Sequence, residues 1–261
     1  MMDLLSAQGR AALARLMAGP AVFGFDFDGT LAPIRATPDE VFMAPPVAQA
    51  FADLTRRLPV AVITGRGVAD IHPRLSGAPR WIVGNHGVEG LPGADPARLR
   101  AQADTCAAWR RQLDDMGLGA MAPLPGKGIF LEDKTYTLCL HYRLAPDREA
   151  ARSLLEQCAH ALRPAPRIVR GKCVLNLLPD GSADKFAALA QLAGSVGGDA
   201  FFIGDDDTDE TVFARAPASW VTVRVGAGCA SAARYRLDSQ DSILACLRLL
   251  FALAGGVGAA V

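Results

Sequence analysis

Short hydrophobic runs alternate along the chain with longer segments whose apolar residues recur at helical spacing. The short runs are rich in β-branched and aromatic residues and predict strands at 22–27, 60–63, 81–83, 200–203 and 220–225. The longer segments predict helices at 6–17, 46–58, 182–193, 208–214 and 239–253. Strands that alternate with helices are typical of a parallel sheet covered by helices on both faces. The pattern therefore predicts the α/β class with a doubly wound sheet.

The middle of the chain departs from this alternation of single strands and helices. Helical patterns at 96–116 and 147–162 are accompanied by strand patterns at 136–142 and 167–178. In the strand pattern at 136–142, Thr, Cys and His face one way and two leucines face the other. We therefore predict an α+β module of residues 98–180, inserted into an α/β domain made of residues 1–97 and 181–261.

Composition and charge exclude several classes of function. The chain has 27 Lys and Arg and 27 Asp and Glu among 261 residues, so it lacks the basic excess of a nucleic-acid-binding protein. Its six cysteines include no C-x-x-C pair, which argues against a zinc or redox site and fits a reducing compartment. The N-terminal segment does not resemble a signal peptide. The apolar stretch at 243–254 is short and interrupted by Arg248, so it predicts a buried helix and not a membrane span. We expect a soluble, cytoplasmic protein that binds neither nucleic acid nor membrane.

Two carboxylates end the first predicted strand, at Asp26 and Asp28, and a Gly-Thr turn follows. Because side chains alternate along a strand, both carboxylates share one face, at the end of an α/β sheet where ligands bind. Neighbouring carboxylates repel unless a cation lies between them or one is protonated. Both arrangements serve phosphoryl chemistry, in which one Asp attacks and its neighbour carries a proton. The alternative is an acidic strand end that leads into an ordinary turn.

A second acidic cluster, GDDDTDE at 204–210, follows the predicted strand at 200–203. The alternative interpretation is a solvated, well-capped helix start, with Thr208 or Asp207 as the cap. Capping employs only one or two of the five acids. Five crowded carboxylates repel strongly, however, and Mg²⁺ takes carboxylate oxygen ligands. We therefore predict a magnesium site here.

Two further segments suit a phosphate ligand. Thr64-Gly65-Arg66 places a hydroxyl and backbone N–H groups at a strand end, although the same tripeptide describes an ordinary turn. Lys185 lies in the first turn of a predicted helix, where it is a surface residue unless a phosphate needs a second positive charge beside a metal.

The inserted module carries polar pairs at strand spacing. Glu132 and Lys134 share one face by the period of two, as do His141 and Arg143. Such pairs form either a charged solvent face of an antiparallel sheet or a surface that recognises sugar hydroxyls.

These stretches, in this order, resemble the haloacid dehalogenase superfamily of phosphohydrolases, and more narrowly its trehalose-6-phosphate phosphatase family. The segments that carry the resemblance are FDFDGTLAPI (25–34), ITGR (63–66), GNHGVE (84–89), EDK with HYR (132–143), GKCV with P-x-G and K (171–185) and GDDDTDE (204–210). The resemblance implies a Rossmann-like parallel-sheet core and identifies the inserted module as a cap domain for substrate specificity.

The resemblance also implies roles for the residues of the core. Asp26 would form an aspartyl-phosphate, and Asp28 would protonate the leaving sugar oxygen and then activate water. Thr64 and Lys185 would hold the phosphoryl oxygens. Mg²⁺ would be bound by Asp26, the backbone carbonyl of Asp28 and Asp205, with Asp206 and Asp209 in supporting positions.

The implied substrate-binding residues are Arg66 and His86 in the core and Glu132, Lys134, Arg143 and Asn176 in the cap, of which Glu132, Lys134 and Arg143 would read the distal glucose. Three positions depart from the family pattern. Asn176 stands where the family usually has Glu, Leu178 where it has a basic residue, and Phe186 where it has Gly. An amide lacks the charge-assisted hydrogen bond of a carboxylate, so these departures bear on sugar specificity.

Four functions follow from this interpretation. The first is a Mg²⁺-dependent trehalose-6-phosphate phosphatase whose substrate a separate synthase supplies. The second is a phosphatase for another glycosyl phosphate, such as a glucosyl-polyol or other disaccharide phosphate. The third is a phosphomutase or phosphotransferase. The fourth, a sugar-phosphate sensor without catalysis, is disfavoured because a sensor needs neither a nucleophile nor an acid.

Overall fold

The computed structural model describes residues 1–35, 37–119, 124, 126–226 and 230–256. The chain divides into two compact units, which we call the core unit and the inserted unit. The core unit comprises Met1–Leu91 and Ala183–Val261, and the inserted unit comprises Pro92–Ser182.

The core unit is built on a seven-stranded sheet with the strand order β1-β11-β10-β9-β2-β3-β4, in which every neighbouring pair is parallel. The strands are β1 (Met2–Asp3), β2 (Ala21–Phe25), β3 (Val60–Ile63), β4 (Trp81–Val83), β9 (Asp199–Gly204), β10 (Val221–Val225) and β11 (Tyr235–Leu237). The α-helices are α1 (Ala7–Met17), α2 (Pro45–Thr55), α3 (Val68–Ile71), α6 (Lys185–Ser195), α7 (Glu210–Phe213) and α8 (Ile243–Gly256). Short 3₁₀ helices are η1 (Pro38–Glu40), η2 (His72–Arg74), η3 (Asn85–Gly87) and η4 (Gln240–Ser242).

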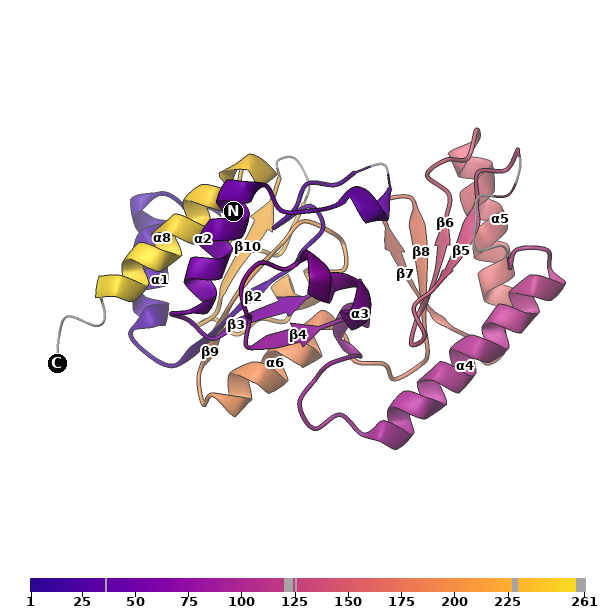
Figure 1. The fold of residues 1–261 in the computed structure, drawn as a ribbon, viewed down its shortest axis with the longest axis horizontal. Coiled ribbons are helices and arrows are strands. Elements are labelled where there is room, and N and C mark those ends of the chain that lie inside the picture. The colour runs from indigo at the N-terminus through magenta and orange to yellow at the C-terminus, as the bar shows by residue number, and fades with distance from the viewer. Residues whose placement is uncertain (36, 120–123, 125, 227–229, 257–261) are drawn as a thin grey trace. The chain divides into compact units, whose positions relative to one another are not determined.

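Alternate residues of the strands enter two separate hydrophobic clusters. On one face Phe25 of β2 packs with α1, α2 and α8, and its ring meets that of Phe51 edge to face at 5.9 Å between centroids. On the other face Val22 of β2 and Phe202 of β9 pack with α6 and α7. Figure 1 shows α6 on the side of the sheet opposite α8. Since successive side chains point to opposite faces, a sheet covered on both sides needs apolar residues at every strand position. The predicted α/β class with a doubly wound sheet is confirmed.

The inserted unit holds a four-stranded antiparallel sheet with the order β5-β6-β8-β7. Its strands are β5 (Phe130–Asp133), β6 (Leu138–His141), β7 (Arg167–Gly171) and β8 (Val174–Leu178), and its helices are α4 (Pro96–Asp115) and α5 (Arg148–Ala161). Leu140 and Leu175 pack in one cluster with Trp109 of α4 and Leu155 of α5. The residues that alternate with the buried leucines along the strands lie on the opposite face of the sheet. They include Glu132, Cys139, His141 and Asn176.

The predicted α+β insertion is thus confirmed as a fold, whereas its role as a cap stays a prediction. The single strand predicted at 167–178 is wrong, because the chain turns at Lys172 and Cys173 and forms the hairpin of β7 and β8. Cys173 has a φ of 65°, a left-handed conformation for which its residue type gives no warning. The sequence patterns also missed β1, β5 and β11, which have two to four residues each.

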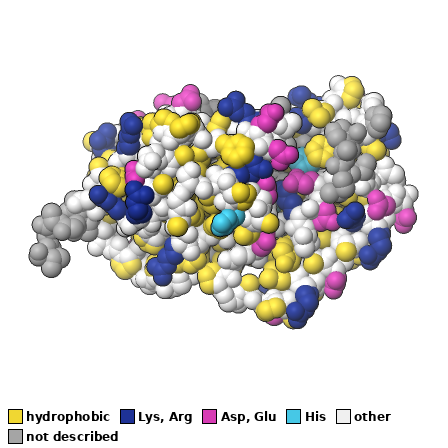
Figure 2. All heavy atoms as spheres, in the orientation of Figure 1, with side chains coloured by type: hydrophobic (Ala, Val, Ile, Leu, Met, Phe, Trp, Pro, Cys, Tyr) yellow, Lys and Arg dark blue, Asp and Glu magenta, His cyan; other side chains and the backbone are white. Residues whose placement is uncertain are grey.

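No helix in the described part of the chain is long and apolar enough to cross a membrane. The predicted helix at 239–253 is realised as η4 and α8, and residues Cys246, Leu247 and Leu250 of α8 are fully buried. On the visible face of the molecule, Lys and Arg side chains are interspersed with Asp and Glu (Figure 2), as the zero net charge of the chain suggests.

Candidate active site

Four neighbouring strands end at the same edge of the parallel sheet, in the order β9-β2-β3-β4. Asp26 follows β2, Thr64 follows β3, Asn85 and His86 lie in η3 after β4, and Asp205 follows β9. The backbone N–H of Asp26 donates to the carbonyl oxygen of Ile203 at 2.9 Å, so the hydrogen bonding between β2 and β9 continues to this point. The fold thereby brings together polar residues that are far apart in the sequence.

Three buried carboxylates converge at this edge. Oxygens of Asp26, Asp205 and Asp209 lie within 4.8 Å of one another. The ammonium of Lys185, the first residue of α6, lies 2.9 Å from Asp26 Oδ1 and 2.7 Å from Asp209 Oδ1. These side chains are all between 0 and 6% exposed. Such burial makes each charge depend on its neighbours, because little water is present to screen or solvate it.

The net charge of this cluster is suited to binding a divalent cation. Burial alone would lower the pKa of Lys185, but Asp209 and Asp26 outweigh it and raise that pKa, so the ammonium is charged. Burial raises the pKa of Asp26 well above its usual range, and although Lys185 opposes this shift, Asp209 and Asp205 add to it. Three carboxylates and one ammonium carry a net charge of −2 when all are ionised. Oxygen ligands with this charge fit Mg²⁺.

Two glycines permit the close approach of these carboxylates. Gly29 has a φ of 81°, and a Cβ at this position would lie 2.2 Å from a carboxylate oxygen of Asp205. A Cβ at Gly204 would lie 2.2 Å from the carboxyl carbon of Asp209. The hydroxyl of Thr30 donates to Asp205 Oδ1 at 3.3 Å. The glycines of FDFDGT and GDDDTDE therefore shape the cluster directly.

The other acids of the 204–210 segment have different partners. Asp206 accepts a hydrogen bond from the backbone of Asp207 at 2.7 Å, and Asp207 is exposed. Glu210 forms an ion pair with Arg224 at 3.1 Å. The predicted helix cap at Thr208 or Asp207 is wrong, because α7 begins at Glu210 and its N-cap residue is Asp209, which makes no side-chain capping bond. Asp209 instead accepts from Lys185 and from the backbone N–H of Asp206 at 2.9 Å.

The side chain of Asp28 does not join the carboxylate cluster. Arg66 binds it with a two-pronged contact, in which Nε and Nη2 donate to Asp28 Oδ2 and Oδ1 at 2.8 and 2.7 Å. Nη1 of Arg66 donates to Asp70 at 2.7 Å, and Asp70 also accepts from Arg74 at 2.7 Å. Burial would raise the pKa of Asp70, but its bonds to Arg74 and Arg66 lower it. Arg66, a predicted substrate-binding residue, is thus bound here to two carboxylates.

Sequence reasoning missed Asp70 and Arg74. Their spacing offered a signal, because Arg66, Asp70 and Arg74 follow one another at intervals of four, as ion pairs on a helix do. We did not predict a helix in this region, and α3 has only four residues.

Thr64 and His86 lie beside the backbone of Gly65 and Arg66. Thr64 is fully buried, its hydroxyl accepts from the backbone N–H of Arg66 at 3.2 Å, and its carbonyl accepts from the N–H of His86 at 2.9 Å. A Cβ on Gly65 would lie 2.5 Å from the His86 ring. Glu89, at the end of GNHGVE, accepts from the side chain of Asn85 and from the backbone of Val68, so it holds the β4 end against the start of α3.

The predicted substrate residues of the inserted unit lie mostly on its polar sheet face. Glu132 Oε2 lies 2.7 Å from His141 Nε2 and 3.6 Å from Lys134 Nζ. Asn176 accepts from Cys139 Sγ at 3.1 Å and donates to the carbonyl of Val169 at 3.2 Å.

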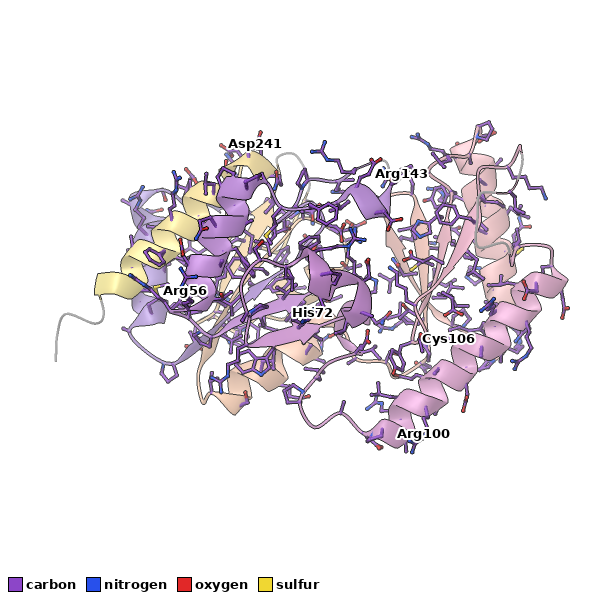
Figure 3. All side chains as sticks on the ribbon, in the orientation of Figure 1. Arg56, His72, Arg100, Cys106, Arg143 and Asp241 are labelled. Carbon is purple, nitrogen blue, oxygen red and sulfur yellow. The ribbon has the colours of Figure 1, made fainter. Side chains whose placement is uncertain are left out.

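Arg143 differs from that group. It follows β6 (Figure 3), and its guanidinium donates to the carbonyl oxygen of Lys172 in the turn between β7 and β8, at 2.7 Å. Of the departing residues, Leu178 is buried, and Phe186 packs with Trp220 at 5.8 Å between ring centroids.

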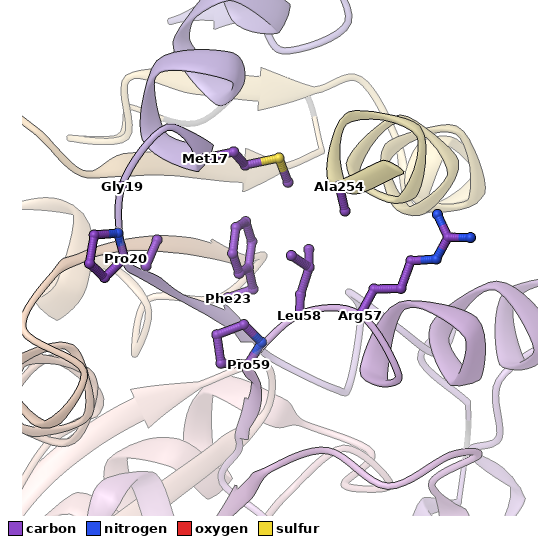
Figure 4. Close-up of a pocket in the computed structure, with 9 residues that line it drawn as sticks. Met17, Gly19, Pro20, Phe23, Arg57, Leu58, Pro59 and Ala254 are labelled. Carbon is purple, nitrogen blue, oxygen red and sulfur yellow. The ribbon is translucent and has the colours of Figure 1, made fainter. Parts of the chain in front are cut away.

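A pocket of ≈ 340 Å³ lies away from these residues, at the N-terminal ends of β2 and β3 (Figure 4). Met17, Phe23 and Leu58 contribute apolar side chains to it, and Arg57 contributes a cation that also lies over the Phe251 ring at 3.7 Å. It shares none of the polar residues at the strand ends, so it does not belong to the candidate active site.

Solved structures share this fold. One described as a trehalose-6-phosphate phosphatase related protein matches with a TM-score of 0.72 and 23% identity, over 91% of this chain and 99% of its own. The C-terminal domain of trehalose-6-phosphate phosphatase from C. albicans matches with a TM-score of 0.72 and 19% identity, over 98% of both chains. At these identities the likeness concerns the fold alone.

Sequence comparison is more specific. Trehalose-phosphate phosphatase of Mycobacterium tuberculosis H37Rv is 34% identical over 206 residues, which cover 74% of this chain and 50% of that protein. The Mycobacterium avium protein of the same name is 36% identical over 214 residues, with the same coverage. The chain thus spans about half the length of these curated relatives. Residues 24–241 match the family model for trehalose-phosphatase, and the chain belongs to that family within the haloacid dehalogenase superfamily.

Proposed function

We propose that this chain hydrolyses trehalose 6-phosphate to trehalose and inorganic phosphate. The observation that carries the proposal is the placement of Asp26 2.9 Å from Lys185, beside Asp205 and Asp209, in a member of the trehalose-phosphatase family. This arrangement supplies a nucleophile together with the positive charge that a phosphate dianion requires.

Mg²⁺ is the cofactor we propose, because the cluster offers three buried carboxylates, which together with the Lys185 ammonium carry a net charge of −2 when all are ionised. Asp26, Asp205 and the backbone carbonyl of Asp28 would hold it, with Asp206 and Asp209 in support. When bound, it would neutralise charge on the phosphoryl group.

The reaction divides into two steps at Asp26 and Asp28. A carboxylate oxygen of Asp26 attacks phosphorus, the bond between phosphorus and the sugar oxygen breaks, and that oxygen takes the proton of Asp28. Asp28 then takes a proton from water, whose oxygen attacks the aspartyl-phosphate and restores the Asp26 carboxylate as phosphate leaves. One residue thus serves as acid and then as base.

Lys185 and Thr64 hold the phosphoryl oxygens in this scheme. Lys185 is suited to the task because α6 and two carboxylates fix its ammonium. Arg66 orients Asp28 through its two-pronged contact, since a guanidinium fork binds a carboxylate in one plane. Because both oxygens of Asp28 accept from this fork, the contact holds Asp28 as the carboxylate that receives a proton from water, and one prong opens when Asp28 carries the proton for the sugar oxygen.

Sugar specificity is assigned to the inserted unit. The predicted cap, residues 98–180, carries Glu132, Lys134, Arg143 and Asn176 for recognition of sugar hydroxyls. Arg66 and His86 are the predicted substrate-binding residues of the core, residues 1–97 and 181–261. The polar sheet face with Glu132, Lys134 and Asn176 supports this assignment.

The substrate would come from a separate synthase, and we expect both enzymes in the cytoplasm. The described cysteines are free thiols, as a reducing compartment requires, and they are Cys106, Cys139, Cys158, Cys173 and Cys246.

Phosphate release from trehalose 6-phosphate, measured beside a panel of mono- and disaccharide phosphates, tests the proposal. We expect selective release from trehalose 6-phosphate, lost on addition of a chelator. Release from a different glycosyl phosphate alone would keep the core chemistry and support the second function, for which the family departure at Asn176 is the specific observation. An isomeric sugar phosphate without free phosphate would identify a mutase or phosphotransferase instead.

A further inference from the structure

Three different metal-binding side chains meet on the polar face of the inserted sheet. Glu132 of β5 and Cys139 of β6 are directly opposed in the antiparallel register, and His141 lies two residues beyond Cys139 on the same strand. All three therefore project from one face. One ligand atom from each, a carboxylate oxygen, the thiol sulfur and an imidazole nitrogen, lies within 4.8 Å of the other two.

The strands and their neighbours hold these side chains in place. The His141 ring stacks on Phe130, its register partner, with 4.6 Å between ring centroids and 12° between ring planes. His141 Nε2 lies 2.7 Å from Glu132 Oε2. Cys139 Sγ donates to Asn176 Oδ1 at 3.1 Å. A site supported in this way by a sheet needs little rearrangement to bind an ion.

Sulfur, imidazole nitrogen and carboxylate oxygen are the ligand types of zinc. Tetrahedral bonds of about 2.0–2.3 Å place ligand atoms roughly 3.3–3.8 Å apart, so separations within 4.8 Å require only small side-chain shifts. We propose that Glu132, Cys139 and His141 bind a zinc-class divalent cation, with water as the fourth ligand. The mixed ligand set distinguishes this site from the all-carboxylate cluster of the core unit, which favours Mg²⁺.

An ion reaches this site from the solvent side. The Glu132 and His141 side chains are 33% and 18% exposed, whereas Cys139 lies fully buried beneath them. An entering cation therefore meets the carboxylate and imidazole first and the thiol last.

Lys134 opposes the metal. Its ammonium lies 3.6 Å from Glu132 and must move away before a cation can take its place. Burial raises the pKa of the Cys139 thiol to about 11, although Lys134 acts in the opposite direction. The thiol is therefore protonated near neutral pH, and its proton passes to solvent when the sulfur binds the metal. Both costs set the affinity of the site.

Metal binding has a consequence that rests on the proposed function. Glu132 and Lys134 are the proposed readers of the sugar, and a bound cation occupies the first and displaces the second. Zinc-class ions are then expected to compete with the sugar phosphate, while Mg²⁺ supports turnover.

A Co²⁺ titration of the full chain in saturating Mg²⁺ tests the site. A thiolate bound to Co²⁺ gives a charge-transfer absorption in the near ultraviolet, which the all-oxygen core cluster cannot give. We expect this absorption to saturate at one Co²⁺ per chain. Cys139→Ser should abolish it, and Cys106→Ser should leave it unchanged, since Cys106 is an equally buried thiol that lies on α4 (Figure 3). No absorption, or absorption that persists in Cys139→Ser, would overturn the proposal.

Competition of Zn²⁺ with a chromophoric chelator gives a second measurement. Cys139→Ser and His141→Gln should each weaken Zn²⁺ binding by at least about tenfold, the lower end of the loss seen when a supporting residue of a metal site is removed. Lys134→Met should tighten it. His141 is partly exposed, so its variant keeps the test open if Cys139→Ser fails to fold. Equal affinity in His141→Gln and wild type would refute the site. Neither measurement depends on turnover, so the metal site can be tested even if the proposed phosphatase function fails.

Discussion

The two polar clusters of this molecule differ in how fully they are removed from water. In the core unit, Lys185, Asp26 and Asp209 are between 0 and 6% exposed and are held in short ion pairs. In the inserted unit, Glu132, Lys134 and His141 are 15 to 33% exposed. Buried charges cannot lose a partner without a large penalty, whereas partly exposed charges can turn to water. The ion pairs of the core cluster are therefore fixed, whereas those on the sheet face of the inserted unit can rearrange.

The largest effect should come from Asp26→Asn. The amide keeps the size of the side chain but removes the nucleophile, and we expect kcat to fall at least about 10⁴-fold, on the scale seen when a catalytic group is removed. Phosphate release measures it, with circular dichroism to verify folding. Asp207→Asn, in the exposed part of the acidic segment, is the matched control and should retain activity. Turnover by Asp26→Asn near the wild-type rate would contradict the mechanism.

Lys185→Met in the core cluster should destabilise the protein more than Lys134→Met in the inserted unit. It leaves Asp26 and Asp209 buried without their ammonium, a change of the kind that costs about 3–5 kcal/mol in the free energy of unfolding. Lys134→Met removes a partly exposed partner of Glu132 and should cost about 1 kcal/mol or less. Urea unfolding without divalent metal measures both, and similar losses in the two variants would remove the contrast on which the comparison depends.

Arg66→Lys should show whether this residue orients Asp28 or binds substrate. Lysine keeps the positive charge but cannot make the two-pronged contact, so we expect kcat to fall about 10²-fold, the scale associated with misplacement of a catalytic group. The matched control is Arg56→Lys, since Arg56 pairs with Asp53 on the surface (Figure 3). A rise in KM with unchanged kcat would return Arg66 to the substrate-binding role predicted from the sequence.

Glu132→Gln should have the smallest effect. The amide keeps the shape but loses charge-assisted hydrogen bonds, which are roughly twice as strong as neutral ones, so we expect KM to rise about tenfold with little change in kcat. Steady-state kinetics on trehalose 6-phosphate measure it. Glu149→Gln, whose side chain is 87% exposed, serves as control. A loss confined to kcat would argue that Glu132 acts on the chemistry and not on the sugar.

The local pattern predicted strands β3 and β4 well because both are apolar at every position. The structure has β3 and β4 at the predicted residues 60–63 and 81–83. The β7–β8 hairpin escaped prediction because its turn at Lys172 and Cys173 contains none of the Gly or Asn residues that usually mark such turns.

The site was predictable where residues adjoin in sequence and less so where they meet in space. The acidic segment at 204–210 predicted a cation site, and the family resemblance placed Asp205 and Asp209 around the same ion as Asp26. Neither indicated that Glu210 pairs with Arg224. The zinc-class site proposed above likewise has no signature in the sequence, which lacks a C-x-x-C pair. Glu132 and Cys139 come from two strands, and their register, not their spacing in the chain, brings them together.

The pairing of β2 with β9 has a consequence for the order of folding. Ala21 and Asp199 are register partners, and the chain between them includes the entire inserted unit. During synthesis from the N-terminus, β2 emerges long before β9, and contacts so distant in sequence form slowly. Asp26 is therefore made well before Lys185 and Asp209, with which it is grouped in the folded protein. By the time these two residues are made, all strands of the inserted unit are already present. We expect the nascent chain to form the sheet of the inserted unit first and to assemble the carboxylate cluster only when Lys185, Asp205 and Asp209 have been made.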